Sequence, residues 1–449
     1  MRSARNKVLH ELADLPLVEH VLRAAEALGP DRIVVVVGNG ADAVRELVGD
    51  RAECVLQAEQ LGTAHAVLQA RKALRGAAGE TFVVYGDVPL LAAATLKKLA
   101  AVHRRRDALV TVLSAVLDDP AAYGRVVRGD DGKVARIVEH ADASPAERRI
   151  AEINSGTYCF DTKFLFSELG RLDRGNRQGE YYLTDLLERA AARGAAECVC
   201  TDDVMEALGV NDRADLALAE GALRARLIAG WQRRGVTFVD PDTAYVGADV
   251  KIGRDTVVGP NVRLTGTTRI GQDCRLDGSS YLADTKIAAG THVRWGVVAD
   301  GADVGKAARV GPYAHLRPQA ELAERVHIGN FVEVKKSRIG AGSKANHLAY
   351  VGDTTVGRDA NIGAGTITCN YDGVNKHRTV IGDRVQIGSD TQLVAPVKVG
   401  AGAFIAAGST ITRDVAPDAL AFNDKPQKQR KGWASAFLRR ARALKAKGG

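Results

Sequence analysis

Apolar residues recur at every sixth position through much of the stretch from Val246 to Ile411. An α-helix has a period near 3.6 residues and a half-buried strand a period of about 2, so neither produces this spacing. A six-residue period is typical of a parallel β-helix, in which each coil stacks an apolar side chain on the coil before it. Gly follows many of these positions and suits the tight corners of such a coil. The first and last runs are Val246, Ile252, Val258, Leu264, Ile270, Leu276 and Leu282, and Ile381, Ile387, Leu393, Val399, Ile405 and Ile411.

The first half of the chain has a different pattern, in which short apolar runs alternate with helical spacing as far as about residue 208. Buried strands between helices predict a doubly wound α/β sheet, where ligands bind beyond the carboxyl ends of the strands. Residues 211–234 predict a long helix with few core positions, which would connect the two domains. The predicted strands are residues 32–37 and 81–85, and the predicted helices are residues 17–28 and 62–74.

Composition narrows the classes of protein that fit. The 449 residues suffice for two or three domains, and the 46% apolar content is that of a folded globular protein. The sequence contains no uninterrupted apolar run of about 18 residues, so we expect no membrane span. Residues 1–7 lack the apolar core of a signal peptide. We therefore expect a cytoplasmic protein. The six cysteines have no zinc-binding spacing, which favours reduced, buried thiols.

The net charge of +8 is concentrated near the end of the sequence. Residues 425–447 contain nine Lys or Arg and no Asp or Glu, so the rest of the chain is nearly neutral and no nucleic-acid-binding face is expected. Within that segment Trp433, Phe437, Ala441 and Leu444 fall on one helical face. Such a face would lie on a membrane surface or, as we favour, pack on the protein or on a neighbouring subunit.

Two features of the α/β half suggest chemistry. Asp87 comes just after the strand at residues 81–85. A carboxylate at this position is well placed to hold Mg²⁺ beside phosphates. The alternative is that Asp87 only forms an ordinary turn before Pro89. Gly62 and Thr63 stand at the start of a predicted helix. The free backbone amides at such a helix start can bind an anion or the edge of a base. The alternative is that these two residues only form an ordinary N-cap. The spacing leaves both pairs of alternatives open.

Three polar segments break the six-residue repeat and contain candidate binding and catalytic residues. Arg317 and Lys335 suit a phosphate or a carboxylate, and His347 is a candidate general base. An isolated His is more often a surface residue or a satisfied core residue, but several polar breaks in one stack favour a function. The segments are residues 315–318, 330–336 and 344–350, and caps or insertions are expected around residues 297–303 and 370–376.

Longer motifs give the chain a resemblance, nearly from end to end, to the bacterial bifunctional enzymes that act as glucosamine-1-phosphate N-acetyltransferase and N-acetylglucosamine-1-phosphate uridylyltransferase. The motifs are Lys7–His10, Leu56–Thr63, Tyr85–Leu90, Gln178–Asp185, Gly329–Glu333 and Gly363–Gly373. The resemblance implies acetyl transfer from acetyl-CoA to glucosamine-1-phosphate, followed by uridylyl transfer from UTP to N-acetylglucosamine-1-phosphate. The products would be UDP-N-acetylglucosamine and pyrophosphate, for peptidoglycan and lipopolysaccharide precursors.

The resemblance also implies an architecture and an assembly. The β-helix would be left-handed, and the protein would be a homotrimer with active sites between subunits. Mg²⁺ would be the cofactor, and sugar phosphates would be the small-molecule partners. Together with the patterns above, the resemblance divides the chain into a Rossmann-like nucleotidyltransferase domain at residues 1–210, a linker helix at 211–234, a hexapeptide-repeat acetyltransferase β-helix at 235–424 and a basic tail at 425–449.

Site residues are implied by the resemblance position by position. In the first domain they are the Mg²⁺ ligands Asp87 and Asn211, the uridine nucleotide contacts Lys7, Gln57, Gly62, Thr63, Tyr85 and Gly86, and the sugar contacts Gly124, Glu139 and Asn154. In the β-helix they are the general base His347, the sugar-phosphate residues Arg317, Lys335, Tyr350 and Asn361, and the acetyl-CoA and active-site contacts Ala364, Asn370, Tyr371, Ser389 and Ala407.

Two departures from the family pattern affect these expectations. The family has a buried strand and a Gly-rich phosphate-binding loop before the position of Met1. Either the natural start lies upstream, which the intact motifs favour, or uridylyl transfer is impaired and acetyl transfer alone remains. Asp424 stands where the family tends to have an Arg near acetyl-CoA, and Lys425 or the basic tail would substitute for it.

Two other function classes compete with this interpretation. A metal-dependent β-helix hydratase would use His315, His327 and His347 as ligands, but the sugar-phosphate residues around them fit it poorly. A purely structural solenoid would have regular coils without Arg317, Lys335 and His347 clustered at the breaks. We therefore expect a bifunctional transferase.

Overall fold

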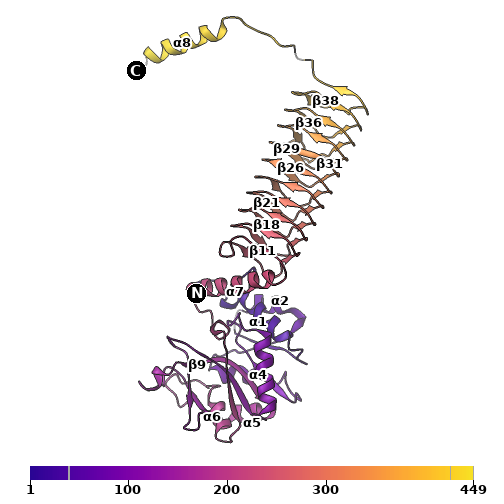
Figure 1. Ribbon diagram of the computed structural model, residues 1–449. Helices are drawn as coiled ribbons and strands as arrows, with labels where there is room; N and C mark the ends of the chain where they lie inside the picture. Colours follow the sequence, from indigo (N-terminus) through magenta and orange to yellow (C-terminus); the bar gives the residue numbers. More distant parts are fainter. Residues whose placement is uncertain (39–40, 425, 448–449) are drawn as a thin grey trace. The chain divides into compact units, whose positions relative to one another are not determined.

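The chain folds into two compact units (Figure 1). The computed structural model describes residues 1–38, 41–424 and 426–447. The first unit is formed by residues 1–233 and 245–250, and the second by residues 234–244 and those from 251 onward.

A mixed sheet forms the centre of the first unit. The described strands of this sheet are β5 (Glu80–Val83), β6 (Val110–Val116), β7 (Arg125–Arg128), β8 (Val134–Val138), β9 (Glu152–Asp161) and β10 (Ala196–Cys200). They follow the order β10-β6-β9-β7-β8, and β5 also pairs with β9. β10 runs parallel to β6, whereas β9 runs antiparallel to β5, β6 and β7. The predicted α/β class is confirmed, with a mixed rather than a purely parallel sheet.

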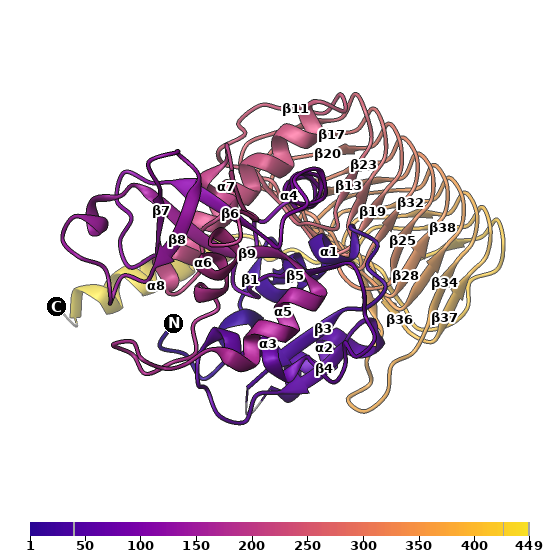
Figure 2. The same cartoon turned by 90° about the horizontal axis from the view of Figure 1, so that it is seen from below.

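Helices cover both faces of this sheet (Figure 2). Because successive side chains of a strand point to opposite faces, Tyr158 of β9 lies in one core and its neighbour Cys159 in the other. The first core includes α5 (Thr162–Glu168) and α6 (Asp185–Ala191), and the second includes α4 (Ala93–Arg105). The sheet is therefore buried on both faces, as the apolar runs of the first half predicted.

The segments predicted from the sequence occur with shifted boundaries. The strand predicted at residues 32–37 is β3 (Val34–Val37), which is mostly half-buried and pairs with β4 (Glu53–Leu56) in a separate parallel sheet. The predicted helices are α1 (Leu17–Glu26) and α3 (Thr63–Gln69), and α3 is shorter than expected because the chain continues in tight turns. The remaining short elements are η1 (Lys7–Leu9), β1 (Glu11–Leu12), β2 (Leu15–Pro16), α2 (Asp42–Val48), η2 (Gly49–Arg51), η3 (Glu147–Arg149), η4 (Leu169–Arg171) and η5 (Val204–Glu206).

The long helix α7 (Arg213–Gln232) belongs to the first unit. Asp212 and Asp215 form a capping box that closes its N-terminus. Few of its side chains are buried, as the sparse apolar pattern predicted.

Residues 245–250, which include β12 (Tyr245–Val246), also belong to the first unit. The Arg23 guanidinium donates to both carboxylate oxygens of Asp249, at 2.7 and 3.1 Å. The N–H of Ala248 donates to the carbonyl of Ala13 at 3.0 Å. This segment therefore completes the first unit after the chain has passed through α7.

The second unit is a parallel β-helix whose short strands form three faces. The first face contains β11 (Thr237–Phe238), β14 (Val257–Val258), β17 (Arg275–Leu276), β20 (His292–Val293), β23 (Arg309–Val310), β26 (His327–Asn330), β29 (Lys344–His347), β32 (Asn361–Ile362), β35 (Gln386–Ile387), β38 (Phe404–Ile405) and β40 (Leu420–Ala421). The second contains β15 (Arg263–Thr265), β18 (Tyr281–Ala283), β21 (Val298–Asp300), β24 (His315–Leu316), β27 (Glu333–Lys335), β30 (Tyr350–Gly352), β33 (Ile367–Cys369), β36 (Gln392–Val394) and β39 (Thr410–Ile411). The third contains β13 (Lys251–Ile252), β16 (Arg269–Ile270), β19 (Lys286–Ile287), β22 (Asp303–Val304), β25 (Ala320–Leu322), β28 (Ser337–Ile339), β31 (Thr354–Val356), β34 (Thr379–Ile381) and β37 (Val397–Val399).

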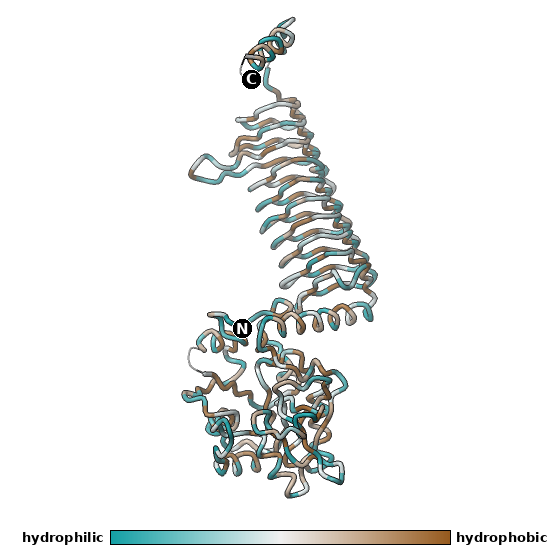
Figure 3. Tube along the Cα trace, turned by 90° about the vertical axis from the view of Figure 1, so that its left-hand side faces the viewer, coloured by the Kyte–Doolittle hydropathy of each residue, from teal (hydrophilic) through white to brown (hydrophobic). Residues whose placement is uncertain are grey.

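The six-residue pattern marks the core of this β-helix. Every position of the two runs, Val246 to Leu282 and Ile381 to Ile411, is buried, with at most 6% of the residue exposed. Apolar and polar segments alternate along the coils in Figure 3. The fold predicted from the period is therefore confirmed.

The coils vary in length at the second corner, where the chain passes from the second face to the third. Leu282 and Ile287, the buried residues on either side of one such corner, are five positions apart instead of six. A single residue with positive φ makes each short corner. These residues are Asp284, Gly301, Lys336 and Asp353, with φ between 45° and 55°.

One of the two predicted insertions is wrong. Residues 297–303 contain β21 and the start of β22, and their corner is one residue shorter than the repeat because Gly301 turns the chain alone. The insertion predicted at residues 370–376 is confirmed, since the buried positions Thr368 and Ile381 are 13 residues apart. The loop between them, residues 370–378, extends away from the coils in Figure 2.

The three polar segments do not interrupt the repeat, contrary to the expectation from the sequence. Leu316, Val334 and Val351 fill the buried positions of the strands that carry polar residues. The polar side chains occupy the outward positions of these strands or the corners, so the core remains continuous.

The basic tail forms a helix, α8 (Trp433–Lys447). The rings of Trp433 and Phe437 stack, with centroids 5.1 Å apart, and both residues are about half exposed. The described residues of this chain therefore do not supply the packing surface that we favoured. Among those residues, no helix has the length and apolar character needed to cross a bilayer.

The cysteines are free thiols. Cys159 and Cys274 are buried, as expected, whereas Cys200 is exposed. Burial raises the pKa of the Cys198 thiol to about 12, so this thiol stays protonated at neutral pH.

Candidate active sites

Lys7, Asp87 and Asn211 meet in the first unit although they lie far apart in the sequence. Lys7 stands in η1, Asp87 follows Gly86 after β5, and Asn211 precedes α7. The Lys7 ammonium donates to the Asp87 carboxylate at 2.5 Å and to the Asn211 side-chain oxygen at 3.0 Å. The carbonyl of Asp87 also accepts from the N–H of Val210 at 2.8 Å, which holds the two segments together. A carboxylate and an amide oxygen thus converge on one cation position, and these are oxygen donors that Mg²⁺ prefers.

Gln57, Gly62 and Thr63 form a second group at the start of α3. Gly62 has a φ of +109°, and a Cβ there would lie 2.6 Å from the carbonyl oxygen of Tyr181, so only Gly fits. The Thr63 hydroxyl accepts from the N–H of Leu183 at 3.1 Å, and Gln57 donates to the carbonyl of Gly62 at 3.3 Å. The structure therefore brings these three predicted nucleotide contacts together.

Tyr85 lies between this group and the sheet. Its hydroxyl is hydrogen-bonded with Thr63, and a Cβ at Gly156 would overlap its ring. The N–H of Gly156 donates to the Asn154 side-chain oxygen at 2.9 Å, and the Asn154 amide donates to the Tyr158 hydroxyl at 2.8 Å. Burial raises the pKa of the Tyr85 hydroxyl, which therefore remains a hydrogen-bond donor at neutral pH.

The three predicted sugar contacts, Gly124, Glu139 and Asn154, are neighbours. The carbonyl of Gly124 accepts from the N–H of Asn154 at 2.9 Å. A Cβ at Gly124 would lie 3.2 Å from the Glu139 carboxylate, so the two residues are in close contact. Burial raises the pKa of the Glu139 carboxyl. The small Gly124 leaves the half-buried carboxyl accessible to a ligand.

Arg125 holds this region in place, although the hydrophobic pattern gave no sign of it. The residue is 2% exposed, and its guanidinium donates to backbone carbonyls that include those of Tyr123 and Arg148. The Tyr123 hydroxyl in turn accepts from the N–H of Gly209 at 3.1 Å. Arg is normally a surface residue, so only its position beside Gly124 could have suggested a role.

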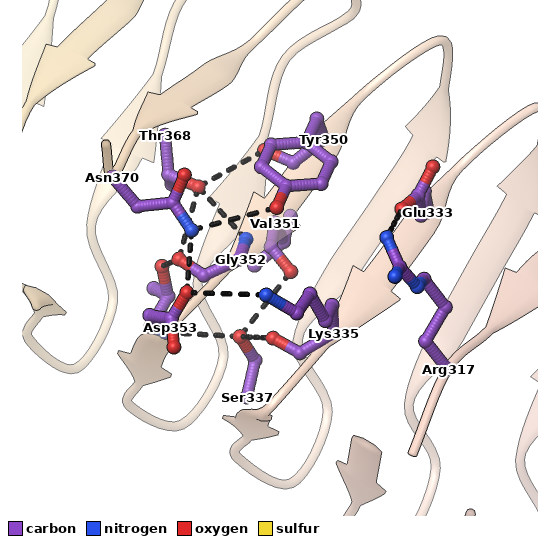
Figure 4. A network of polar contacts seen from close by, with 11 residues as sticks. Arg317, Glu333, Lys335, Ser337, Tyr350, Val351, Gly352, Asp353, Thr368 and Asn370 are labelled. Atoms are coloured by element: carbon purple, nitrogen blue, oxygen red, sulfur yellow. Dashed lines mark hydrogen bonds and ion pairs between the residues drawn. The ribbon is translucent and has the colours of Figure 1, made fainter. Parts of the chain in front are cut away.

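A polar cluster lies at the second corner of the β-helix (Figure 4). The Lys335 ammonium lies 3.9 Å from the Asp353 carboxylate, which accepts from the Asn370 amide at 2.5 Å. The same amide donates to the Tyr350 hydroxyl at 3.4 Å. Three predicted residues, Lys335, Tyr350 and Asn370, therefore come together from successive coils.

Arg317 lies one coil before this cluster and pairs with Glu333 at 2.9 Å, as Figure 4 shows. Glu333 and Lys335 belong to the same strand, β27. A planar guanidinium and an ammonium on neighbouring coils are suited to bind a phosphate group.

His347 lies at the first corner, where the chain passes from the first face to the second. Its Nδ1 is 2.8 Å from the side-chain oxygen of Asn330. Because that oxygen only accepts, Nδ1 is the donor of this hydrogen bond, and in the neutral ring the lone pair is then on Nε2. Within the described residues, no hydrogen bond or ion pair joins His347 to Lys335 of the same chain. The predicted base and the predicted phosphate ligand are at opposite ends of the second-face strands.

Ala364, Ser389 and Ala407 follow His347 along the first corner, one in each later coil. Backbone hydrogen bonds link these corners, for example from the N–H of Gly408 to the carbonyl of Ser389 at 2.8 Å. The predicted acetyl-CoA contacts thus form a column parallel to the axis of the coil, with His347 at one end.

Two predicted residues lie outside both groups. Asn361 is on the first face, in register with Lys344 of the previous coil. Tyr371 belongs to the loop at residues 370–378 and is 57% exposed, and the Lys376 ammonium lies 5.0 Å from its ring centroid. Among the described residues, no hydrogen bond or ion pair joins Asn361 or Tyr371 to His347.

The hydratase alternative requires histidines that converge on one metal ion. His315 lies on the second face and His327 on the first. In the described part of the chain, no group of three or more His, Cys, Asp or Glu side chains could hold a metal ion. Within the described residues of one chain, these histidines therefore do not form such a metal site.

Two charged residues near the cluster were not predicted. The Asp353 carboxylate lies 3.9 Å from the Lys335 ammonium. Lys376, in the loop at residues 370–378, lowers the pKa of Lys335 electrostatically. Both belong to the second corner, where the number of residues changes from coil to coil, so the six-residue period gives no register for them. Asp424 is exposed after β40, and Lys425, its expected substitute, lies outside the described residues.

Two protein families match the chain. The nucleotidyl transferase family matches residues 2–231, which is slightly more than half of the sequence. The family described as bacterial transferase hexapeptide, with six repeats, matches residues 378–413 of the β-helix. These matches agree with the α/β domain and the left-handed β-helix that the sequence predicted.

Curated relatives match almost the whole length. A protein of Trichlorobacter lovleyi is 51% identical over 96% of this chain and 95% of its own. One of Halalkalibacterium halodurans is 48% identical, covering 94% and 92%, and one of Exiguobacterium sibiricum is 50% identical, covering 94% of both chains. All three bear the name bifunctional protein GlmU.

Proposed function

The chain belongs to the family of bifunctional GlmU proteins, and we propose that its two transferase reactions are divided between the two units. The protein transfers an acetyl group from acetyl-CoA to glucosamine-1-phosphate, and a uridylyl group from UTP to N-acetylglucosamine-1-phosphate. One observation carries the division. Each unit contains its own polar cluster, and each cluster lies in or beside the segment that matches the corresponding transferase family.

Uridylyl transfer takes place in the first unit. A phosphate oxygen of N-acetylglucosamine-1-phosphate attacks the α-phosphorus of UTP, and the bond to pyrophosphate breaks. Lys7 offsets the negative charge of the reacting phosphates. The group around Thr63 binds the uridine nucleotide, and the group around Glu139 binds the sugar.

Mg²⁺ fits the first site. Asp87 and Asn211 would hold it, because their oxygens already converge on the Lys7 ammonium, at 2.5 and 3.0 Å. When bound, the ion supplies positive charge to the phosphate oxygens.

Acetyl transfer takes place at the β-helix. The amine of glucosamine-1-phosphate attacks the thioester carbon of acetyl-CoA, and the bond to sulfur breaks. Nε2 of His347 takes the proton from the amine, since Asn330 keeps the other ring nitrogen protonated. Arg317 and Lys335 bind the sugar phosphate, and the column from Ala364 to Ala407 binds acetyl-CoA.

A homotrimer would complete the acetyl-transfer site. In one chain His347 and Lys335 are at opposite ends of the second face, so a neighbouring copy could bring the base of one chain to the phosphate ligands of another. An exposed apolar strip beside His347 also favours contact between copies. The strip consists of Trp295, Tyr313, Phe331 and Leu348, which are 41%, 51%, 56% and 62% exposed. The assembly acts in the cytoplasm, the compartment that supplies both UTP and acetyl-CoA.

Two variants, one in each unit, test the division. Asp87→Asn removes the charge of the metal ligand and should lower pyrophosphate release from UTP and N-acetylglucosamine-1-phosphate about 100-fold or more, with acetyl transfer unchanged. His347→Ala removes the general base and should lower acetyl transfer about 100- to 10,000-fold, with pyrophosphate release unchanged.

Both reactions are measured on the same preparations, so each serves as the folding control for the other. Loss of both activities in a variant whose Tm equals that of the wild type would contradict the division between units. Full acetyl transfer by His347→Ala would show that another group is the base.

A further inference from the structure

Asp353, which belongs to none of the motifs that carry the resemblance, lies in the polar cluster of Lys335, Tyr350 and Asn370 (Figure 4). The Asp353 side chain is 16% exposed and the Lys335 side chain 15% exposed, so both are largely shielded from water. Asp353 accepts from Asn370 at 2.5 Å and lies 3.9 Å from the Lys335 ammonium. It therefore links two residues that are assigned to the acetyl-transfer site.

The backbone fixes the position of this carboxylate. Asp353 makes a one-residue corner with a φ of +50°, a conformation that Asp and Asn tolerate better than most residues. Its N–H donates to the carbonyl of Lys335 at 3.0 Å, and its carbonyl accepts from the N–H of Thr379 at 3.3 Å. The corner thus holds the coil of Lys335 against the coil that carries the loop at residues 370–378.

The surroundings of Lys335 act on the charge of its ammonium in both directions. Burial lowers the pKa of its ammonium, and the cations Lys376, Lys336 and Arg317 lower it further. Lys376 belongs to the loop at residues 370–378, Lys336 to the same coil as Lys335, and Arg317 to the coil before. Asp353 acts in the opposite direction and raises the pKa of Lys335.

We propose that Asp353 is a positioning residue for acetyl transfer, which keeps Lys335 in place and charged so that Lys335 can bind the phosphate of the sugar. The proposal rests on the role assigned to Lys335 under the proposed function. A carboxylate at this place repels a phosphate, so its benefit is indirect and depends on Lys335. This dependence makes the proposal testable.

The test variant is Asp353→Asn, because Asn accepts the same hydrogen bond and tolerates the same φ but has no charge. KM for glucosamine-1-phosphate and kcat are measured from about pH 6.5 to about pH 9. KM should rise about tenfold at the alkaline end, and its rise should begin at a lower pH than in the wild type, because Lys335 loses its proton more readily. The kcat at saturating substrate should change by less than about twofold.

Asp284→Asn is the matched control. Asp284 makes the same type of corner in an earlier coil, with a φ of +46°, and its carboxylate accepts from Thr267 at 2.9 Å. This control should leave KM and its pH dependence unchanged. The proposal would be overturned by an unchanged KM in Asp353→Asn, by a similar change in both variants, or by a fall in kcat and thermal stability without a change in KM.

A third variant, Lys335→Gln, separates this proposal from the proposed function. It should raise KM at every pH, and adding Asp353→Asn to it should raise KM no further. If Lys335→Gln alone keeps the wild-type KM, the role assigned to Lys335 is wrong, and the inference is overturned with it. If Lys335→Gln raises KM and Asp353→Asn does not, the inference alone is overturned.

Discussion

Asp185 shows how its surroundings alter the ionisation of a single residue. It stands at the start of α6, where burial and the neighbouring Glu188 and Asp173 raise the pKa of its carboxyl to about 6. In the unfolded chain the pKa of such a group is about 3.9. Between about pH 4 and pH 6 the folded protein therefore holds a proton that the unfolded chain has released, and stability falls as the pH rises through this window.

Asp185→Asn should stabilise the protein at neutral pH, because the amide removes the cost of a half-buried anion. After discounting for solvent screening, we expect about 1–2 kcal/mol at pH 7.5, or roughly 2–6 °C in Tm. At pH 4.5 the difference should fall to about a third of this value, because the folded wild type is then protonated while the unfolded chain is still mostly ionised. Thermal unfolding at the two pH values measures the effect. Equal stabilisation at both would exclude a titration of Asp185 as its cause.

The site residues were proposed one by one from the resemblance. Lys7, Asp87 and Asn211 were identified by resemblance, whereas their meeting depends on tertiary contacts that no spacing rule supplies. Arg125 was missed because a charged side chain is expected outside the core. Asp353 was missed because its effect depends on Lys335 of the previous coil.

The coils of the β-helix are joined by buried hydroxyl groups as well as by apolar side chains. Ser343 donates to the carbonyl of Gly357 at 2.7 Å and accepts from the N–H of Ala360 at 2.9 Å. Ser337 bonds the next coil in the same way, through Val351 and Thr354. The period predicted the strands well because each coil repeats one environment. It could not predict the second corner, where some coils are one residue shorter than the repeat.

Ser343→Ala should destabilise the β-helix, since it leaves a buried carbonyl and a buried N–H without their partner. The expected loss is about 1–3 kcal/mol, which corresponds to a lower Tm for the second unit. Pyrophosphate release should be unchanged at temperatures where the β-helix is still folded. Ser279→Ala, at an exposed corner, is the matched control and should have little effect. A Tm change as large in the control would mean that the hydroxyl bonds between coils contribute nothing measurable.

At the scale of the whole molecule, the hydrophobic pattern predicted two units. The first half alternates strand and helix patterns, and the second half has a six-residue period. The sequence could not assign α7 and residues 245–250 to the first unit, because the six-residue pattern already begins at Val246. The association of copies of the chain is also a property of the whole molecule. The exposed apolar strip at the first corner is the feature that favours this association.

The wild type should sediment with a mass about three times the 47.6 kDa of one chain. Phe331→Arg places a charge in the apolar strip, so it should weaken the assembly and lower acetyl transfer with it. Pyrophosphate release should persist, since its residues belong to the first unit. A monomeric wild type with full acetyl transfer would refute a site shared between copies. Arg338→Glu, on the third face, controls for a change of surface charge.

The return of residues 245–250 to the first unit also sets an order of events during protein synthesis. Arg23 is made early, yet its partner Asp249 is 226 residues away and leaves the ribosome only after α7. An N-terminal unit usually folds while the rest of the chain is still being made. Here the last segment of the first unit is also the opening of the coil, so synthesis of the first unit is completed only as synthesis of the coil begins.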